Sequence, residues 1–513
     1  MFSARFNLAL FALIISAFPA MAQEKLDAHA MFQSRCAACH GGDRLGGIGP
    51  ALLPENLGRL RKAEAVKVVT EGRPATQMEG FGHELDQAMI KELVDYVYSP
   101  LPQIPAWGIA EIEASREPVT PVSVEKPAYK ADPLNLFVVV EGGDHHITIL
   151  DGDSFESLIR IPTRYALHGG PKFTSDGRYV FWASRDGWVT KFDLWALAPV
   201  AEVRAGINTR NIAVSSDDRY VMVANYLPNT LVVLDAENLK PIKIIPVTDG
   251  IKGSRVSAVY NAPPRKSFIV ALKDIPEVWE IPYSDDPPYY GWVHDWQNDG
   301  PPKQQPLPIR RIILDDYLDD FFFDQDYEHL LGAARDGGNA QVVWLRSGRK
   351  IADVALSGLP HLGSGITWNT GQQSVLASPN LQKSELALID MKDWSVIKML
   401  ETPGPGFFLR SHKDSPYAWG DGMMGKNKDT MYLVDKQTMT IARTIRPEPG
   451  RTAAHVEFDR YGKYALISIW EMDGALLVYD TNTLEVVKRL PMSKPVGKYN
   501  VWNKITFSEG TSH

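Results

Sequence analysis

Cysteine is almost absent from this chain of 513 residues, which contains only Cys36 and Cys39. A framework of several disulfides is therefore excluded, and the two thiols are expected to act together. Long hydrophobic runs are also scarce. The one apolar run, at residues 6–18, is too short to span a bilayer comfortably, and no other long apolar segment exists. We therefore expect no membrane span.

An excess of basic residues is missing as well. The 54 Lys and Arg are outnumbered by 62 Asp and Glu, which gives a formal net charge of -8. This balance argues against nucleic acid or an anionic membrane surface as a partner. With 44% hydrophobic and 23% charged residues, the composition is that of an ordinary globular protein, and the length is too great for one small core. At least two domains are expected.

The first residues carry the features of an export signal. Arg5 supplies a positive charge before the apolar run, and Ala20-Met21-Ala22 offers small residues at the two positions that a signal peptidase reads. We expect residues 1–22 to be a signal peptide, with the mature chain beginning near Gln23. The expected destination is a periplasm, where haem is attached to cysteines.

The two cysteines belong to the segment CAACH, residues 36–40, which is the signature of covalent haem attachment. Thiols on one helical turn can add to the two vinyl groups of one haem, and His40 then lies beneath the iron as an axial ligand. A zinc site would lack two ligands, and a redox dithiol would not need the histidine. The pattern predicts a covalently bound haem c and a cytochrome c domain at residues 23–99.

The sixth ligand of this haem has two candidates. Met78 lies in the loop before the last expected helix, where small c-type cytochromes place a methionine. A thioether ligand there would raise the haem potential. His83, slightly further along the chain, is the competitor. We predict that Met78 is the ligand.

Proline is concentrated between residues 100 and 133. This composition is typical of an extended spacer rather than a packed element. We therefore predict a Pro-rich linker over residues 100–133, which marks the domain boundary.

From about residue 134 the chain repeats itself loosely. The unit is a turn such as Ser-Asp-Gly-Arg, a strand, a short turn and a second strand that ends in Leu-Asp or Tyr-Asp, as in residues 175–193 and 216–235. Eight such units of about forty residues predict a β-propeller rather than a β-sandwich array. The expected fold is a small all-α cytochrome c domain followed by an all-β eight-bladed β-propeller at residues 134–513.

Several stretches at the ends of these units are more specific than the repeat itself. They are Tyr165-Ala166-Leu167-His168, Arg185-Asp186-Gly187, Gly358-Leu359-Pro360-His361 and the closing Pro495-Val496-Gly497-Lys498-Tyr499-Asn500-Val501-Trp502. In these stretches, and in a c-type haem domain fused to a propeller, the chain resembles the haem d1-binding family, which includes cytochrome cd1 nitrite reductase. The resemblance covers nearly the whole mature chain and implies a tetrapyrrole bound at one mouth of the propeller channel.

The resemblance also implies roles for particular residues. His168 matches the histidine that holds the haem d1 iron from below. Haem d1 is rich in carboxylates, and Arg185, Arg210 and Arg255 match family arginines that pair with these groups. A guanidinium suits a carboxylate because two parallel charge-assisted bonds can form.

One departure from the nitrite reductases concerns the space above the iron. Those enzymes place two histidines there, which donate protons to bound nitrite. One of them matches His361, whereas Asp319 stands where the other would fall. Loss of a proton donor should impair nitrite chemistry, because the leaving oxygen must depart as water. His361 is then expected to be a distal ligand or gate above the iron.

The end of the chain, residues 494–504 and 508–513, resembles the dihydro-haem d1 dehydrogenase group of this family. That resemblance implies oxidation of one propionate of dihydro-haem d1 to the acrylate of haem d1. His455 is the candidate base, because imidazole is suitably basic near neutral pH. Tyr499 could hydrogen-bond the carboxylate or pass a proton. Both positions look like those that the group uses.

Two alternatives remain beside this dehydrogenase. A nitrite reductase is disfavoured by Asp319, and a haem d1 carrier or chaperone would need neither His455 nor an electron outlet. The resemblance implies a tetrapyrrole substrate and a periplasmic electron acceptor as partners. Nitrite reductase and other haem d1 maturation proteins are further candidates.

Overall fold

The structure, a computed structural model, describes residues 27–47, 49–58, 60–72, 78–103, 105–119, 124–285, 306–333, 339–507 and 509–511. The predicted signal peptide lies outside these residues. Among the described residues, no helix is both long enough and apolar enough to span a bilayer.

The N-terminal part of the described chain is a small all-α domain. Asp27 and Asp86 cap its first and last helices, since each side chain accepts a hydrogen bond from a backbone N–H three residues on. The last helix buries Ile90, Leu93 and Val94. The helices are α1 (Ala28–Arg35), α2 (Ala37–His40), α3 (Pro54–Leu57), α4 (Lys62–Glu71) and α5 (Gln87–Val97).

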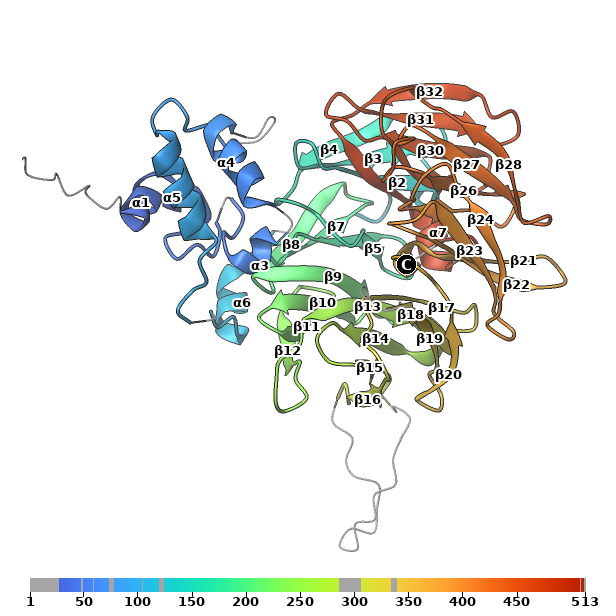
Figure 1. Ribbon diagram of the computed structural model, residues 1–513, viewed down its shortest axis with the longest axis horizontal. Coiled ribbons are helices and arrows are strands. Elements are labelled where there is room, and N and C mark those ends of the chain that lie inside the picture. Colours follow the sequence, from blue (N-terminus) through green and yellow to red (C-terminus); the bar gives the residue numbers. More distant parts are fainter. Residues whose placement is uncertain are drawn as a thin grey trace, which may run out of the picture.

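Eight antiparallel sheets follow, and Figure 1 shows them arranged around a common centre. Each sheet is one blade, and its strands are given from the innermost outwards. Blade 1 contains β33 (Pro495–Asn500), β2 (Leu136–Glu141), β3 (His146–Asp151) and β4 (Ser157–Pro162). Blade 2 contains β5 (Lys172–Phe173), β6 (Tyr179–Ala183), β7 (Trp188–Asp193) and β8 (Ala198–Arg204). Blade 3 contains β9 (Asn208–Val214), β10 (Tyr220–Leu227), β11 (Thr230–Asp235) and β12 (Pro241–Pro246).

The other five blades have the same strand order. Blade 4 contains β13 (Val256–Ala262), β14 (Ser267–Leu272), β15 (Glu277–Pro282) and β16 (Arg310–Ile313). Blade 5 contains β17 (Asp320–Phe323), β18 (His329–Ala333), β19 (Ala340–Trp344) and β20 (Arg349–Val354). Blade 6 contains β21 (Ile366–Asn369), β22 (Ser374–Pro379), β23 (Glu385–Asp390) and β24 (Val396–Glu401). Blade 7 contains β25 (Leu409–Arg410), β26 (Tyr417–Asp421), β27 (Met431–Asp435) and β28 (Thr440–Ile445). Blade 8 contains β29 (Ala453–Phe458), β30 (Tyr464–Ile469), β31 (Ala475–Asp480) and β32 (Val486–Pro491).

The recurring turn residues explain why the blades begin and end where they do. In the Ser-Asp-Gly-Arg turn of blade 2, Thr174 Oγ1 accepts from the backbone N–H of Tyr179, which opens β6. In six of the blades an aspartate ends the third strand and caps the next turn, as where Asp193 Oδ1 accepts from the N–H of Trp195. Apolar residues of neighbouring blades then pack together, so the core is a ring of layers between blades. The predicted eight-bladed propeller is confirmed.

The ring closes between the two ends of the propeller sequence. Strand β33 pairs with β2, with Tyr499 opposite Val138. The short helix α7 (Val501–Thr506) follows β33 and lies near the centre of the ring (Figure 1). Three short 3-10 helices lie in the connections: η1 (Pro133–Asn135), η2 (Pro263–Arg265) and η3 (Leu362–Ser364).

The segment between the domains differs from the extended spacer predicted over residues 100–133. It contains helix α6 (Ile109–Ser115) and strand β1 (Glu117–Pro118), which adds to the outer edge of β8. Ile112 is fully buried against blades 2 and 3, and Trp107 Nε1 donates to the carbonyl of Arg204 at 2.8 Å. These two large apolar side chains anchor the segment on the propeller despite its proline content.

Candidate functional site

The predicted site residues of the propeller gather at one mouth of its channel. The innermost strands of the blades all run in the same direction, so the residues at their starts meet at one end. His168 lies just before β5, Arg210 is in β9, His361 lies just before β21, and His455 is in β29. Residues far apart in sequence are thereby placed around one opening.

His168 has the geometry of a metal ligand. Its Nδ1 lies 2.6 Å from the carbonyl oxygen of Arg210. A carbonyl has no proton to give, so Nδ1 carries the proton and Nε2 keeps a lone pair for a metal. In this structure Nε2 accepts from Arg210 Nη1 at 2.9 Å, so the guanidinium must turn aside before Nε2 can bind iron.

His361 is held in the same manner at another blade. Its Nδ1 lies 2.7 Å from the carbonyl oxygen of Phe407, and its Nε2 lies 3.9 Å from Asp320 Oδ2. Burial lowers the pKa of His361, although Asp320 opposes this change. The ring is therefore neutral near pH 7 and presents Nε2 to the mouth, consistent with a distal ligand or gate.

His455 differs from both. A register shift in β29 between Ala454 and Val456, with φ of +50° at His455, turns its side chain away from the normal alternation. The residue is fully buried, and neither ring nitrogen has a hydrogen-bond partner among the described residues. Its ring lies 5.4 Å from that of Tyr499 and 4.6 Å from that of Phe408. The two predicted catalytic residues are thus neighbours.

Four cationic residues to which the sequence analysis gave no role lie around this pair. They are Lys172, Arg410, Lys498 and Lys504. Arg410 is 3% exposed, its Nη1 donates to the carbonyl of Leu409, and its Nε has no hydrogen-bond partner within the described residues. Lys498 is fully buried and donates to Ser468 Oγ at 2.8 Å and to the carbonyl of His455.

Burial lowers the pKa values of all four cations, and the charge of Arg410 lowers those of the three lysines further. Burial, with Arg410 nearby, lowers the pKa of Lys172 to about 8 and that of Lys504 to about 7. Burial and the charges of Lys498, Arg410 and Lys504 lower the pKa of His455 well below its usual value. The two buried carboxylates nearby, Glu457 and Asp421, do not balance four cations. The cluster therefore fits an anionic ligand such as a carboxylate-rich tetrapyrrole.

A positional signal in the sequence could have revealed part of this cluster. Lys172 and Arg410 each stand seven residues before the tyrosine that opens the second strand of a blade, Tyr179 or Tyr417. This repeat position lies on the innermost strand, where a charged residue is unexpected unless it serves the channel. A comparison of the repeat units position by position would have found it.

The three predicted arginines have different contacts in the structure. Arg210 contacts His168, and Arg185 lies in the turn beside it, where its backbone N–H donates to the carbonyl of Ala166. Arg255 instead forms a two-point ion pair with Asp274, with Nη2 to Oδ1 at 2.6 Å and Nε to Oδ2 at 2.8 Å. A carboxylate of the protein occupies its fork, so Arg255 must leave Asp274 before it can pair with a ligand carboxylate, and this assignment stays a prediction.

The haem-attachment segment fits a covalent haem. Cys36 caps helix α2 and Cys39 lies within it, and His40 Nδ1 lies 2.8 Å from the carbonyl oxygen of Pro50, which leaves Nε2 for iron. A Cβ atom at Gly49 would lie 2.8 Å from His40 Cε1, so this position needs glycine.

The two candidates for the sixth ligand of this haem differ in the solvent exposure of their side chains. His83 has a side chain that is 68% exposed, with Nε2 3.4 Å from Glu84 Oε1, whereas Met78 is half-buried. The loop just before Met78 lies outside the described residues. The lower exposure of Met78 favours it as the sixth ligand, and this assignment stays a prediction.

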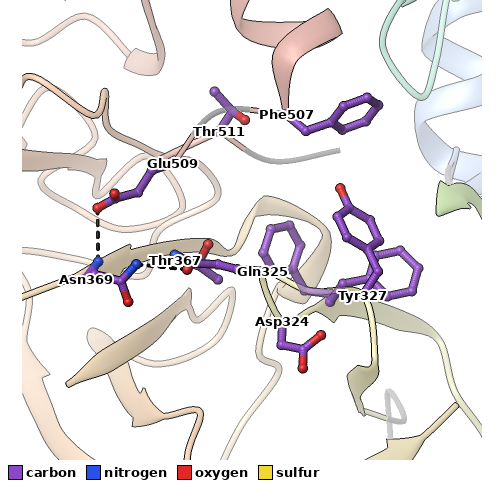
Figure 2. Close-up of a pocket in the computed structure, with 10 residues that line it drawn as sticks. Asp324, Gln325, Tyr327, Thr367, Asn369, Phe507, Glu509 and Thr511 are labelled. Carbon is purple, nitrogen blue, oxygen red and sulfur yellow. Dashed lines mark hydrogen bonds between the residues drawn. The ribbon is translucent and has the colours of Figure 1, made fainter. Parts of the chain in front are cut away.

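A separate cavity of about 230 Å³ lies at the other ends of β17 and β21 (Figure 2). The C-terminal segment borders it, and the N–H of Asn369 donates to Glu509 Oε1 at 3.0 Å. None of the predicted site residues lines it. The mouth that holds His168 and His455 is therefore distinct from this cavity.

Comparison with known proteins places this geometry in a family. Residues 131–504 match the family model described as cytochrome D1 heme domain, and residues 23–97 match that of the cbb3-type cytochrome C oxidase subunit III. The dihydro-heme d1 dehydrogenase of Pseudomonas aeruginosa is 54% identical over 487 residues, which cover 94% of this chain and 95% of the relative. The nitrite reductase of Stutzerimonas stutzeri is 26% identical over 556 residues, covering 94% and 93%.

A solved structure agrees with these relatives. The dihydro-heme d1 dehydrogenase NirN in complex with DHE has a TM-score of 0.88 and 53% sequence identity, covering 93% of this chain and 99% of that chain. Identity of 54% over nearly the full length exceeds the 26% of the nitrite reductase by a wide margin. The chain therefore belongs to the cytochrome D1 heme domain family and, within it, to the dihydro-heme d1 dehydrogenases.

Proposed function

We propose that this protein oxidises one propionate side chain of dihydro-haem d1 to the acrylate of haem d1. The electrons leave through its covalently bound haem c. The observation that carries the proposal is His455, a buried imidazole without a hydrogen-bond partner among the described residues. It lies beside Tyr499 and within a cluster of cations.

The chemistry requires two hydrogens to leave the side chain as two protons and two electrons. His455 takes one proton from a carbon of the propionate, while Arg410 and Lys504 hold its carboxylate; the second proton leaves to solvent as the two electrons pass singly through haem c to the external acceptor. Burial raises the pKa of Tyr499 to about 12, so this phenol stays protonated and can donate a hydrogen bond to the carboxylate. When bound, haem c supplies a one-electron acceptor.

The low pKa of His455 in the free protein has a consequence for the order of events. Burial disfavours its protonation most, and the charges of Lys498, Arg410 and Lys504 add to this effect. A bound carboxylate would offset these charges and raise the pKa of His455 towards the range of an effective base. The base would therefore be more effective when the substrate is in place.

The remaining assignments concern binding. We assign His168 as the ligand below the tetrapyrrole iron and His361 as the group above it. Arg185 and Arg210 are the arginines that would pair with other carboxylates of the tetrapyrrole. Cys36, Cys39 and His40 would hold haem c, with Met78 as the sixth ligand.

The setting of the reaction is also part of the proposal. We place the signal peptide at residues 1–22, the cytochrome c domain at 23–99 and the propeller at 134–513. Attachment of haem to two cysteines fits export to a periplasm. The electron acceptor is then a periplasmic one-electron carrier, and a nitrite reductase is a candidate recipient of the finished haem d1.

The test is to incubate the holo-protein with dihydro-haem d1 and an oxidant, then extract and weigh the tetrapyrrole. We expect a mass loss of about two hydrogens, as oxidation of propionate to acrylate requires. Tight binding without a mass change would contradict the dehydrogenase and favour a carrier. Nitrite reduction by the recovered complex would favour a nitrite reductase, which Asp319, ion-paired with Lys273, disfavours.

A further inference from the structure

The two domains meet in a small apolar interface. On the cytochrome side, Ala51 and Leu53 are 1% exposed, and they pack with Ile207 and Leu227 of the propeller. Leu45, Leu101 and Trp107 border this cluster. Figure 1 shows α3 beside β9 at this place. The interface lies in the loop that follows the haem-attachment segment.

Hydrogen bonds across the interface fix its register. Asn56 Nδ2 donates to the carbonyl of Ile207 at 3.1 Å, and Asn208 Nδ2 donates to the carbonyl of Glu55 at 3.1 Å. Arg204 extends from blade 2 to the carbonyl of Leu45. Apolar packing and reciprocal amide bonds together hold one docked arrangement.

Each side of this interface is bonded to a histidine expected to bind iron. On the cytochrome side, His40 Nδ1 donates to the carbonyl of Pro50, which directly precedes Ala51. On the propeller side, His168 Nδ1 donates to the carbonyl of Arg210, three residues after Ile207. Two hydrogen bonds, two short stretches of backbone and one packed apolar contact therefore connect the two imidazoles.

We propose that the contact of residues 50–53 with residues 207–210 is the electron path between His168 and His40, so that electrons cross within one chain. This inference rests on the proposed function. Electron tunnelling falls steeply across unbonded gaps, so a bonded path with a single packed contact favours rapid transfer. The substrate loses two electrons and haem c takes one, so haem c must pass the first to an external one-electron acceptor before it takes the second.

The experiment follows reduction of haem c by its absorbance after rapid mixing of oxidised holo-protein with dihydro-haem d1 without oxygen. For the unmodified protein we expect a first-order rate that does not change with protein concentration. The variant Leu53→Asp places an unpaired carboxylate in the apolar cluster and should separate the domains. Its haem c reduction should lose this fast phase and become dependent on protein concentration.

Two controls keep the result interpretable. Ile251→Asp adds the same charge at a propeller side chain that is 95% exposed, and it should keep the fast phase. Asn56→Ala combined with Asn208→Ala weakens the interface without adding charge, in case Leu53→Asp does not fold. In every variant, ascorbate should reduce haem c normally, and small-angle scattering without substrate should report whether the domains separate.

The outcomes distinguish the path from the proposed function. Domains that separate in scattering while haem c is still reduced at the original, concentration-independent rate would overturn the path. An unmodified protein that yields haem d1 with an external oxidant but never reduces its own haem c would also overturn it, leaving the dehydrogenase intact. No mass change in the tetrapyrrole would contradict the proposed function itself.

Discussion

At the scale of single residues, the three histidines expected to bind iron hold their rings in one way. His40, His168 and His361 each donate from Nδ1 to a backbone carbonyl, which fixes the tautomer and leaves Nε2 as a possible ligand. His455 makes no such bond within the described part of the chain. Its two nitrogens are therefore available for proton transfer, which separates the base from the ligands by geometry.

Replacing His455 tests this division. His455→Ala should bind dihydro-haem d1 about as tightly as the unmodified protein, while its rate of oxidation should fall about 100-fold or more, as for loss of a general base. Binding is measured by absorbance titration and oxidation by the mass of the extracted tetrapyrrole. His329→Ala is a matched control, because that histidine pairs with Asp324 away from the mouth. Oxidation at an undiminished rate in His455→Ala would remove His455 from the mechanism.

The lysines of the mouth lead to a prediction about pH. Their pKa values, about 8 for Lys172 and about 7 for Lys504, are depressed, so both lose charge as the pH rises above neutrality. A carboxylate ligand favours their charged forms, so binding at pH 8 should take up about one proton. Affinity should accordingly weaken from pH 7 to pH 9.

Calorimetric titration in two buffers of different ionisation enthalpy measures this proton uptake directly. Lys504→Met removes one of the two titrating groups and should reduce the uptake, whereas Lys413→Met changes an exposed lysine and should not. Proton release on binding, or an affinity that strengthens towards pH 9, would contradict a cationic carboxylate site.

At the scale of elements, the turn that carries Arg185 depends on a glycine. Gly187 has φ of +92°, and a Cβ atom there would lie 1.8 Å from the carbonyl oxygen of Gly206. Gly187→Ala should therefore combine backbone strain with a clash and lower the free energy of unfolding by about 3 kcal/mol. Gly371→Ala has a similar φ of +84° but open space around it, and should cost only about 1 kcal/mol. Thermal or urea unfolding compares the two, and equal losses would exclude the clash.

Elements with a local signal could be predicted, and those without one could not. Short motifs encode the turns before β6 and β10 and the aspartates that end β7 and β11, so the eight blades could be predicted from the sequence. Helix α6 did not, because its packing depends on two apolar residues within a Pro-rich segment. The direction of the buried His455 side chain also depends on a bulge that strand alternation does not predict.

At the scale of the whole molecule, ring closure assembles the site. His168 belongs to blade 2, His361 to blade 6 and His455 to blade 8, while Tyr499 returns to blade 1 beside the start of the propeller. The resemblance to relatives identified these residues, because no local pattern states which blade ends meet. The cations Lys172 and Arg410 come from blades 2 and 7 and meet only through closure, so their shared repeat position could have marked them in the sequence but not their proximity.

The charge of the whole molecule and that of its site have opposite signs. The salt dependence of substrate association therefore shows which of the two governs the approach of the substrate. The chain has a formal net charge of -8. If this net charge governed association, it would repel an anionic tetrapyrrole, and salt would screen the repulsion and make association faster. The cationic cluster at the mouth predicts the reverse, because the ligand is attracted over distances near the Debye length of about 10 Å at 0.1 M salt. We expect the association rate of dihydro-haem d1, measured by rapid mixing, to fall as salt rises.

Arg410→Met should weaken that dependence and Arg443→Met should not, since Arg443 lies on the outermost strand β28 of the same blade. A rate that rises with salt in the unmodified protein would mean that the net charge, and not the mouth, governs the approach of the substrate.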